Sequence, residues 1–313
     1  MVLVTGGTNF IGRAVLRKLA TVRPSIRALI QPARRSPRLP YGVELDVALA
    51  ALSDTRGVRA AMVGVDTIIH LAGNWLELDQ ADPAAYEVPA AENLAAAAAD
   101  AGVRQVVTLS LLGADRASAY PLLRSKALAE DPFRALGVPT TILRAAIVYG
   151  EGDSFTTGIA RLAAAAPLLF PIPGDGSTVL QPLWVDDLAT CIQWVLGDVE
   201  RFQGTYEIGG PEYLPFRHIV DLVLKEASMM RIPLPVRQPL LRFFARTLSR
   251  LIKPPFISRH WIDYLAVNRT TDLNTLPEIF GLAPRRFEDH IGYLRGKNWG
   301  WELLRDQLRY ERG

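Results

Sequence analysis

A glycine-rich turn near the start of the chain is the clearest candidate for chemistry. The apolar run 2–5 leads into Gly6-Gly7-Thr8-Asn9-Phe10-Ile11-Gly12, and helical periodicity then continues through Leu16 and Leu19. A strand that turns sharply into a helix leaves the first N–H groups of the helix without partners and directs its positive dipole end at the turn. We therefore expect the diphosphate of a dinucleotide here. The residues expected around it are Gly6, Thr8, Asn9, Phe10, Ile11 and Gly12.

Two glycines of the turn have separate physical roles. Gly6 permits the tight exit from the strand, and Gly12, which lacks a Cβ, lets the helix lie close to the sheet. The middle position falls on Asn9, and asparagine is the non-glycine residue that best tolerates positive φ, so we expect this conformation there. Its side chain then points away from the phosphates or binds them. An ordinary strand-to-helix turn with chance glycines is the alternative.

Other polar residues have simpler explanations. Asp186 and Asp187 precede the helical run 188–196, so N-capping is the first explanation and substrate contact the second. Arg144 stands at a strand end, where we expect it to anchor a carboxylate. His70 is expected to pack at the end of a strand near the ligand. No second histidine or cysteine stands at ligand spacing, so no metal site is predicted.

Short β-branched runs alternate with longer helical runs in the first half of the chain. The expected strands are 26–30, 67–71, 106–109 and 140–143, and a helix over 90–101 ends at Gly102 in the C′ position. This alternation predicts an α/β fold with a parallel sheet and right-handed crossovers. Ligands of such sheets bind beyond the carboxyl ends of the strands, where the strand order reverses.

Composition and length indicate an ordinary globular protein of two parts. The 313 residues are 49% hydrophobic and 21% charged. We expect a nucleotide-binding domain over 1–150 and a substrate lobe over 151–313 that is interleaved with the last strands of the sheet. Cys191 is the single cysteine, no signal-peptide pattern is present, and no apolar run approaches the roughly twenty residues that span a bilayer. These features predict a cytoplasmic protein.

The basic residues of the C-terminal half form a local pattern. In the stretch 239–252, Arg242, Arg246 and Arg250 recur every four residues while apolar residues occupy most of the rest. Such a helix suits an anionic membrane surface or an acidic protein partner. The alternative is a cap helix with its apolar face buried. Because the net charge of the chain is only +3, no nucleic-acid partner is expected.

Five motifs in a fixed order resemble one protein family. After the glycine turn come His70-Leu71-Ala72-Gly73, the segment 144–150, Trp184-Val185-Asp186-Asp187-Leu188-Ala189 and the segment 206–211. Together they resemble the extended short-chain dehydrogenase/reductases, and in particular the atypical branch related to the NADPH-binding subunit of respiratory complex I. NmrA-like and epimerase/dehydratase-like proteins are close to this branch. The resemblance implies a Rossmann-type doubly wound sheet and a nicotinamide coenzyme.

The resemblance also assigns coenzyme contacts outside the turn. Asp46 would accept a hydrogen bond from the adenine amino group while Val47 packs against the adenine face; a solvated loop aspartate is the alternative. The segment 71–73, with Leu71, Ala72 and Gly73, belongs to the same site.

The end of the second strand bears on the choice of coenzyme. No acidic residue is present there to hold an NAD ribose; Gln31 is followed by Arg34 and Arg35, which suit the ribose phosphate of NADP. Solvated surface arginines are the competing explanation. NADP is therefore expected, with NAD as the alternative.

Catalysis in this family uses a tyrosine, a lysine four residues later and a serine at the reacting oxygen. Lys126 fits the lysine, but Leu122 stands four residues before it. Tyr120 lies six residues before Lys126, in a loop if the helix starts at Pro121, from which it could swing toward the site.

The serine and the asparagine that complete the catalytic set of this family are also shifted or absent. Ser110 ends a strand, although the serine position itself falls nearer Leu112, and the expected asparagine falls on Pro89. Lys126 can still bind the nicotinamide ribose. The first hypothesis is an NADP(H)-binding atypical reductase or epimerase-like enzyme with a small carbonyl, isoprenoid-like or sugar-nucleotide substrate, relying on Tyr120 or water for its proton. The second is a non-catalytic NADP(H)-binding protein that senses redox state or supports complex assembly. Monomer and dimer both stay open.

Overall fold

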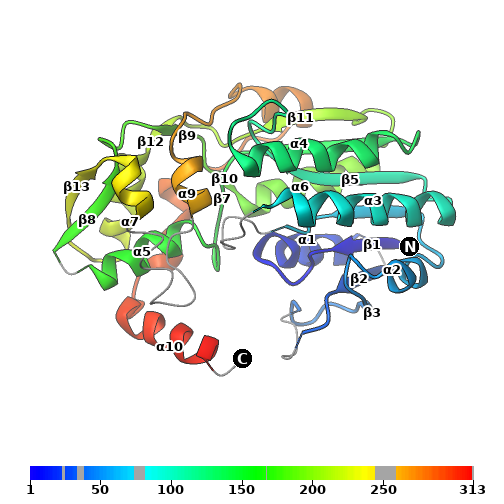
Figure 1. Cartoon of the computed structure of the whole chain (residues 1–313), viewed down its shortest axis with the longest axis horizontal. Helices are drawn as coiled ribbons and strands as arrows, with labels where there is room; N and C mark the ends of the chain where they lie inside the picture. The colour runs from blue at the N-terminus through cyan, green and yellow to red at the C-terminus, as the bar shows by residue number, and fades with distance from the viewer. Residues whose placement is uncertain (23–24, 34–38, 74–81, 167, 244–258, 312–313) are drawn as a thin grey trace.

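A parallel sheet forms the centre of the first half of the molecule (Figure 1). The computed structural model describes residues 1–22, 25–33, 39–73, 82–166, 168–243 and 259–311. Within them, seven strands pair in the order β11-β6-β5-β4-β1-β2-β3, all parallel. The strands are β1 (Val2–Thr5), β2 (Ile26–Ile30), β3 (Asp46–Leu49), β4 (Thr67–His70), β5 (Gln105–Leu111), β6 (Thr140–Ala145) and β11 (Gly204–Ile208).

Helices cover both faces of this sheet, which is the predicted doubly wound Rossmann-type fold. One face is packed by α1 (Phe10–Ala20) and α6 (Val185–Gly197). The other is packed by α2 (Thr55–Ala61), α3 (Ala84–Ala101) and α4 (Pro121–Arg134). The four strands predicted from the sequence all lie in the sheet. Both β11 and α6 come from beyond residue 150, so the later part of the chain completes the sheet.

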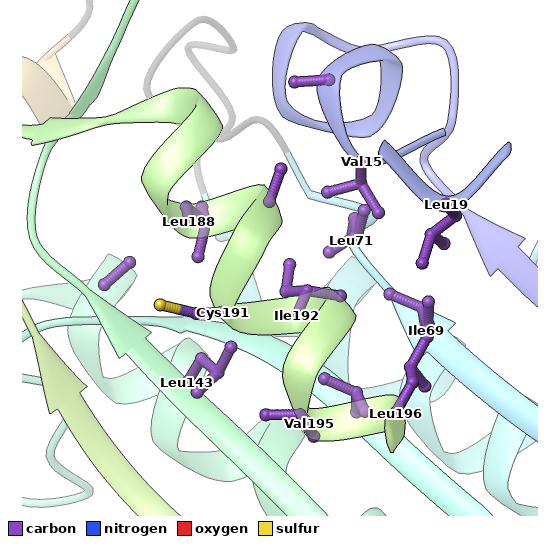
Figure 2. Packing of buried hydrophobic residues seen from close by; sticks show 14 of the residues in the cluster. Val15, Leu19, Ile69, Leu71, Leu143, Leu188, Cys191, Ile192, Val195 and Leu196 are labelled. Carbon is purple, nitrogen blue, oxygen red and sulfur yellow. The ribbon is translucent and has the colours of Figure 1, made fainter. Parts of the chain in front are cut away.

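The α6 helix seals one face of the sheet with a continuous apolar side. Figure 2 shows Ile192 of α6 pointing toward Leu71 and Ile69, with Val15 of α1 beside Leu71, and all four side chains are buried. Burial raises the pKa of the Cys191 thiol, which lies in the same cluster. This thiol is therefore a packing group rather than a reactive one.

The register of the strands brings their carboxyl ends to one edge. Thr5 of β1 pairs with Leu29 on one side and His70 on the other, and His70 pairs with Thr108 of β5. The chain leaves β1 toward β2 and β3 on one side, and later adds β4, β5 and β6 on the other. This reversal between β1 and β4 is the topological switch point, where a crevice for ligands is expected.

A second lobe lies beyond this edge, on the left of Figure 1. It has its own apolar core, which includes Phe155, Phe170 and Trp261. Its helices are α5 (Thr156–Ala165), α7 (Phe216–Glu226), α9 (Arg259–Tyr264) and α10 (Trp299–Glu311), with short helical turns η2 (Glu288–His290) and η3 (Gly292–Leu294). Its strands are β7 (Val148–Tyr149), β8 (Leu169–Pro173), β9 (Val179–Leu180), β10 (Leu183–Trp184), β12 (Leu214–Pro215) and β13 (Ile232–Val236). A further helical turn, η1 (Thr275–Phe280), instead joins the core of the sheet with α1 and α6.

Two element boundaries refine the sequence expectations. The helix expected over 90–101 begins earlier, at Ala84, and continues through Pro89. Its end is as predicted: Gly102 adopts the left-handed conformation with φ of +67°. In the part of the chain that the structure describes, no helix combines the length and the apolar character needed to cross a bilayer.

Candidate functional site

The glycine turn is packed so tightly that side chains are excluded at two positions. Gly6 has φ of +72°, and a Cβ there would lie 2.6 Å from the carbonyl oxygen of Leu71. A Cβ at Gly12 would lie 2.1 Å from the carbonyl oxygen of Gly6. Both distances are well inside van der Waals contact, so the backbone path of this turn requires glycine at both positions.

Asn9 does not have the positive φ predicted for it; that expectation is wrong. Its φ of −75° and ψ of 173° are extended, as an N-cap requires. Its Oδ1 accepts a hydrogen bond from the Gly12 N–H at 2.6 Å, and its Nδ2 donates to the Leu71 carbonyl at 2.9 Å. Asn9 therefore caps α1 and ties the turn to the end of β4, which leaves no need for a left-handed residue.

The start of α1 offers donors to an anion. Among the described residues, no acceptor lies at the N–H groups of Phe10 and Ile11, which open the helix. The Arg13 guanidinium donates to the Thr8 carbonyl at 2.8 Å and brings a positive charge to the same turn. Free amides, a helix dipole and a nearby cation fit a diphosphate group.

A cleft of about 800 Å³ continues from this turn across the carboxyl edge of the sheet. The cleft brings together eight of the residues predicted for the site. Its walls include Asn9, Phe10, Ile11, Leu71, Ala72, Gly73, Ser110 and Lys126. The end of β6 forms another side of the cleft, through residues 145–148.

Lys126 is held by a buried carboxylate from the neighbouring helix. Its Nζ lies 2.5 Å from Oε1 of Glu87 on α3, and the two side chains are 12% and 5% exposed. The second oxygen of Glu87 accepts a hydrogen bond from the Ser125 hydroxyl at 2.6 Å. Glu87 therefore fixes two consecutive residues of α4, and it places the lysine ammonium at the wall of the cleft.

Ser110 belongs to a second buried network. Its hydroxyl donates to Oε1 of Glu130 at 2.5 Å. The same carboxylate accepts from Nε of Arg144 at 3.0 Å and from its Nη2 at 2.8 Å, a paired arrangement that raises the pKa of Arg144. The expectation that Arg144 anchors a carboxylate is confirmed. Since the hydroxyl proton of Ser110 is donated in this hydrogen bond to Glu130, the hydroxyl has a structural role.

Tyr120 lies just before α4 and Leu122 lies within it, as the sequence predicts. Helix α4 starts at Pro121, so Tyr120 stands outside it as the N-cap residue. Its ring faces the Arg269 guanidinium, 5.9 Å from the ring centroid, and it does not line the cleft. Leu122 does line the cleft and is 3% exposed. A hydrocarbon side chain therefore occupies the position four residues before Lys126.

His70 is a neutral, buried neighbour of the site. Its Nδ1 lies 2.8 Å from the Thr5 hydroxyl, and its ring packs against Phe133 with the centroids 5.3 Å apart. Burial, together with the charge of Lys126, lowers the pKa of His70 to about 3. The imidazole is therefore uncharged at physiological pH and supports the end of β4, as expected for this residue.

The structure does not bring Asp46 and Val47 to the cleft, which corrects the adenine contacts expected for them. Asp46 begins β3 instead of following it, and it pairs in register with Arg27. Its carboxylate lies 2.7 Å from the guanidinium of Arg27, and Val47 is 43% exposed. Arg27 in turn pairs with Leu3, two residues before the carboxyl end of β1. Both residues are thus displaced from the ligand edge.

Gln31 does lie at the carboxyl edge, directly after β2. Its side-chain amide donates to the hydroxyl of Tyr86 on α3. Arg34 and Arg35, the two residues expected to select the phosphate of NADP, lie outside the described residues.

Two further expectations are resolved by the packing of the second lobe. Asp187 lies inside α6 instead of capping it, and it accepts a hydrogen bond from the Arg285 N–H at 2.8 Å. Burial raises the pKa of Asp187.

In the basic stretch, residues 238–243 are helical and Arg242 pairs with Asp263 at 2.7 Å. Arg246 and Arg250 lie outside the described residues.

Glu87 and Glu130 are the site residues that sequence reasoning missed. Glu130 stands four residues after Lys126, one turn further along the same helix, and this spacing was a usable signal. Glu87 gave no local signal, because its partners lie 38 and 39 positions away on another helix. No group of three or more potential metal ligands is found among the described residues.

Comparison with known proteins identifies the family. The sequence profile of the NAD(P)H-binding family matches residues 6–166. The mitochondrial NADH dehydrogenase [ubiquinone] 1 alpha subcomplex subunit 9 of Arabidopsis thaliana is 28% identical over 74% of this chain and 60% of its own length. The ceramide reductase of Caulobacter vibrioides is 32% identical over 64% of this chain and 63% of its own length. The chain thus spans less than two thirds of these two relatives.

Other relatives cover nearly the whole chain. A (4-alkanoyl-5-oxo-2,5-dihydrofuran-3-yl)methyl phosphate reductase of Streptomyces griseus is 29% identical over 92% of this chain and 96% of its own. Among solved structures, the UDP-glucose 4-epimerase of Thermus thermophilus in complex with NAD has a TM-score of 0.70 at 20% identity, over 94% of this chain and 99% of its own. An NADPH-bound quinone oxidoreductase of Escherichia coli has a TM-score of 0.71 at 19% identity, over the same shares. At these identities the structures show the fold alone.

The glycine turn, the order of the strands and the family profile all indicate a dinucleotide-binding protein. The chain therefore belongs to the NAD(P)H-binding family related to the short-chain dehydrogenase/reductases, and a nicotinamide dinucleotide is its cofactor.

Proposed function

We propose that the protein is an NADP(H)-dependent reductase of conjugated acceptors, such as quinones or enones, that works without a tyrosine–lysine proton relay. A nicotinamide ring supplies the hydride when it is bound. The amides that open α1 would hold the diphosphate, and Lys126, fixed by Glu87, would donate a hydrogen bond to the nicotinamide ribose. The wall formed by residues 145–148 and Leu122 would keep water from the nicotinamide face.

One observation supports this choice of acceptor. Leu122 lines the cleft in the place where a proton-donating tyrosine would stand, while the Ser110 hydroxyl is committed to Glu130. Reduction of an isolated ketone creates a localised alkoxide, which needs a positioned acid. A conjugated acceptor spreads the new charge over several atoms and can take its proton later from water. The residues present therefore suit the second kind of substrate better than the first.

The test compares three acceptors that share a carbon skeleton: a quinone, an enone and a saturated ketone. Oxidation of NADPH is followed by its absorbance with pure protein. We expect turnover with the first two and a rate at least about 100-fold lower with the ketone, the usual contribution of a general acid. Equal rates for the ketone and the enone would overturn the proposal.

The preference for NADP over NAD is a second part of the proposal. It is supported by the lack of an acidic residue directly after β2, where Gln31 stands, and by Arg34 and Arg35 in the sequence that follows. Calorimetry with NADPH and NADH tests it. An Arg34→Ala/Arg35→Ala variant should lose about tenfold or more in NADPH affinity and keep its NADH affinity. Tighter binding of NADH by the unmodified protein would contradict this preference.

A non-catalytic role is the second candidate. It is favoured by the buried Glu87–Lys126 pair, which stabilises the site without offering an acid, and by relatedness to a subunit of mitochondrial NADH dehydrogenase. Tight NADPH binding, with no oxidation by any of the three acceptors, would select this role: a coenzyme-holding protein for redox sensing or complex assembly.

A further inference from the structure

The second lobe contains an open apolar pocket that the proposed chemistry does not use. It lies between α5, β8, α7 and α9, and most of its lining is hydrocarbon or aromatic, including Ile159, Phe170, Phe216 and Trp261. An apolar cavity gives water few hydrogen-bonding partners, so transfer of a hydrocarbon into it is favourable.

This pocket shares a wall with the coenzyme cleft. Ser154 and Phe155 line both the pocket and the cleft. The Phe155 ring is stacked on Trp261 with a centroid distance of 5.2 Å and an interplanar angle of 12°. The pocket and the cleft are therefore neighbours, with Ser154 and Phe155 between them.

A glycine keeps the pocket open. Gly158 lies within α5 and lines the pocket, and apart from its chain neighbours and the backbone of its own helix no atom lies within 4 Å of the position that its Cβ would take. Glycine inside a helix destabilises it by roughly 1 kcal/mol relative to alanine. Backbone geometry does not require glycine here, since φ is not positive. The residue instead leaves free space at the pocket wall.

We propose that this pocket holds an unbranched aliphatic chain of the substrate while the reducible head lies in the coenzyme cleft. The inference rests on the proposed function for the identity of the head, and on the shared wall for the position of the chain. The substrate class is thus a conjugated acceptor with an alkyl or acyl tail.

Neutral straight-chain alcohols that end in bromine are suitable probes, because they do not bind the diphosphate seat by charge and bromine quenches tryptophan fluorescence. They are titrated into NADPH-saturated protein in a series of increasing chain length. We expect affinity to rise about fourfold per added methylene until the pocket is full. Trp261 lines the pocket, so Trp261→Phe should remove the quenching while the alcohol still raises the melting temperature.

Gly158 supplies the blocking variant and its controls. Gly158→Leu should place its side chain in the pocket and weaken binding of the longest alcohol at least tenfold, while Gly158→Ala should change it less than about threefold. Gly197→Leu, at another helical glycine with open space around its Cβ position, controls for the added bulk and should bind as the unmodified protein does.

Affinity that does not depend on chain length, quenching that persists in Trp261→Phe, or unchanged binding in folded Gly158→Leu would overturn the inference. NADPH affinity, measured in parallel on every variant, separates the two proposals. Normal NADPH binding without alcohol binding refutes the chain pocket alone. Alcohol binding without NADPH binding refutes the proposed function and leaves a hydrocarbon pocket in place.

Discussion

Nζ of Lys126 lies 2.5 Å from Oε1 of Glu87, and this buried ion pair joins α4 to α3 beside the coenzyme cleft. In the related reductases the lysine assists a tyrosine. Here the residue four positions earlier is Leu122, and the lysine ammonium is neutralised by a carboxylate. The pair fixes the position of Lys126 beside the cleft, while the hydrocarbon side chain of Leu122 has no proton to donate.

Glu87→Gln should destabilise the fold by about 3–5 kcal/mol, because it leaves the Lys126 charge buried without a counter-charge. Urea unfolding measures the change. The double variant Glu87→Gln/Lys126→Met removes both charges and should recover most of the loss, which a double-mutant cycle quantifies. A loss below about 1 kcal/mol in the single variant would show that the pair is not energetically coupled.

Leu122→Tyr should create ketone reductase activity, because it places a phenol four residues before Lys126 on the same helical face. We expect NADPH-dependent reduction of a saturated ketone to rise at least about 100-fold. Leu122→Phe is the matched control: it adds the same ring to this buried position without the hydroxyl, and it should leave the rate unchanged. An equal gain in both variants would mean that cleft shape, rather than proton supply, limits the reaction.

The sheet and the glycine turn were predictable because their signals are local. The apolar run 2–5, the glycines at 6 and 12 and the helix after them follow directly from neighbouring residues, and Ile26–Ile30 forms a strand over the predicted range. The end of α3 at Gly102 was predictable because it depends on the left-handed conformation of this one glycine. The order of these signals along the chain was enough to predict the Rossmann-type topology.

The polar contacts of the site were harder to predict because they join distant segments. Nothing near Glu87 indicates that its carboxylate meets Ser125 and Lys126 across two helices. Asp46 was misplaced because a short third strand was assumed to end before it, whereas the strand starts there and Arg27 satisfies its charge. Asn9 was given the wrong φ because capping of Gly12 is a property of the folded turn.

Gly12→Ala should abolish coenzyme binding, because its Cβ would overlap the Gly6 carbonyl oxygen at 2.1 Å and force the turn to open. Calorimetry with NADPH and a melting curve measure the two effects. Gly7→Ala is the control within the same turn: its Cβ would meet a terminal methyl of Leu16 at 2.9 Å, which a flexible side chain can relieve. Equal losses of affinity in the two variants would contradict the role of the close Gly6–Gly12 approach.

Protonation of His70 should destabilise the protein in acid. Its folded-state pKa of about 3 lies below the ordinary value of 6.5, so the unfolded chain binds the extra proton between these values. The contribution of His70 is complete above the upper value and falls by up to about 1.4 kcal/mol per pH unit as the pH drops toward the lower one. In urea unfolding of His70→Asn, the free energy of unfolding should depend less steeply on pH, by the slope that corresponds to uptake of about one proton. His218→Asn, at an exposed histidine, should keep the full slope.

The far end of the second lobe should bind anionic membranes. Strands β8 and β13 lie at the left edge of Figure 1, where Leu169 pairs with Ile232, and these residues and Leu234 are 44%, 57% and 44% exposed. An exposed apolar strip followed in the chain by the exposed Arg237 suits the headgroup boundary of a bilayer. Flotation with anionic vesicles should recover the protein, and Ile232→Gln/Leu234→Gln should reduce recovery about tenfold or more. Val63→Gln removes an apolar residue near α2 that is more exposed, at 70%, and this variant should float normally. Failure of the unmodified protein to float would rule out the membrane contact.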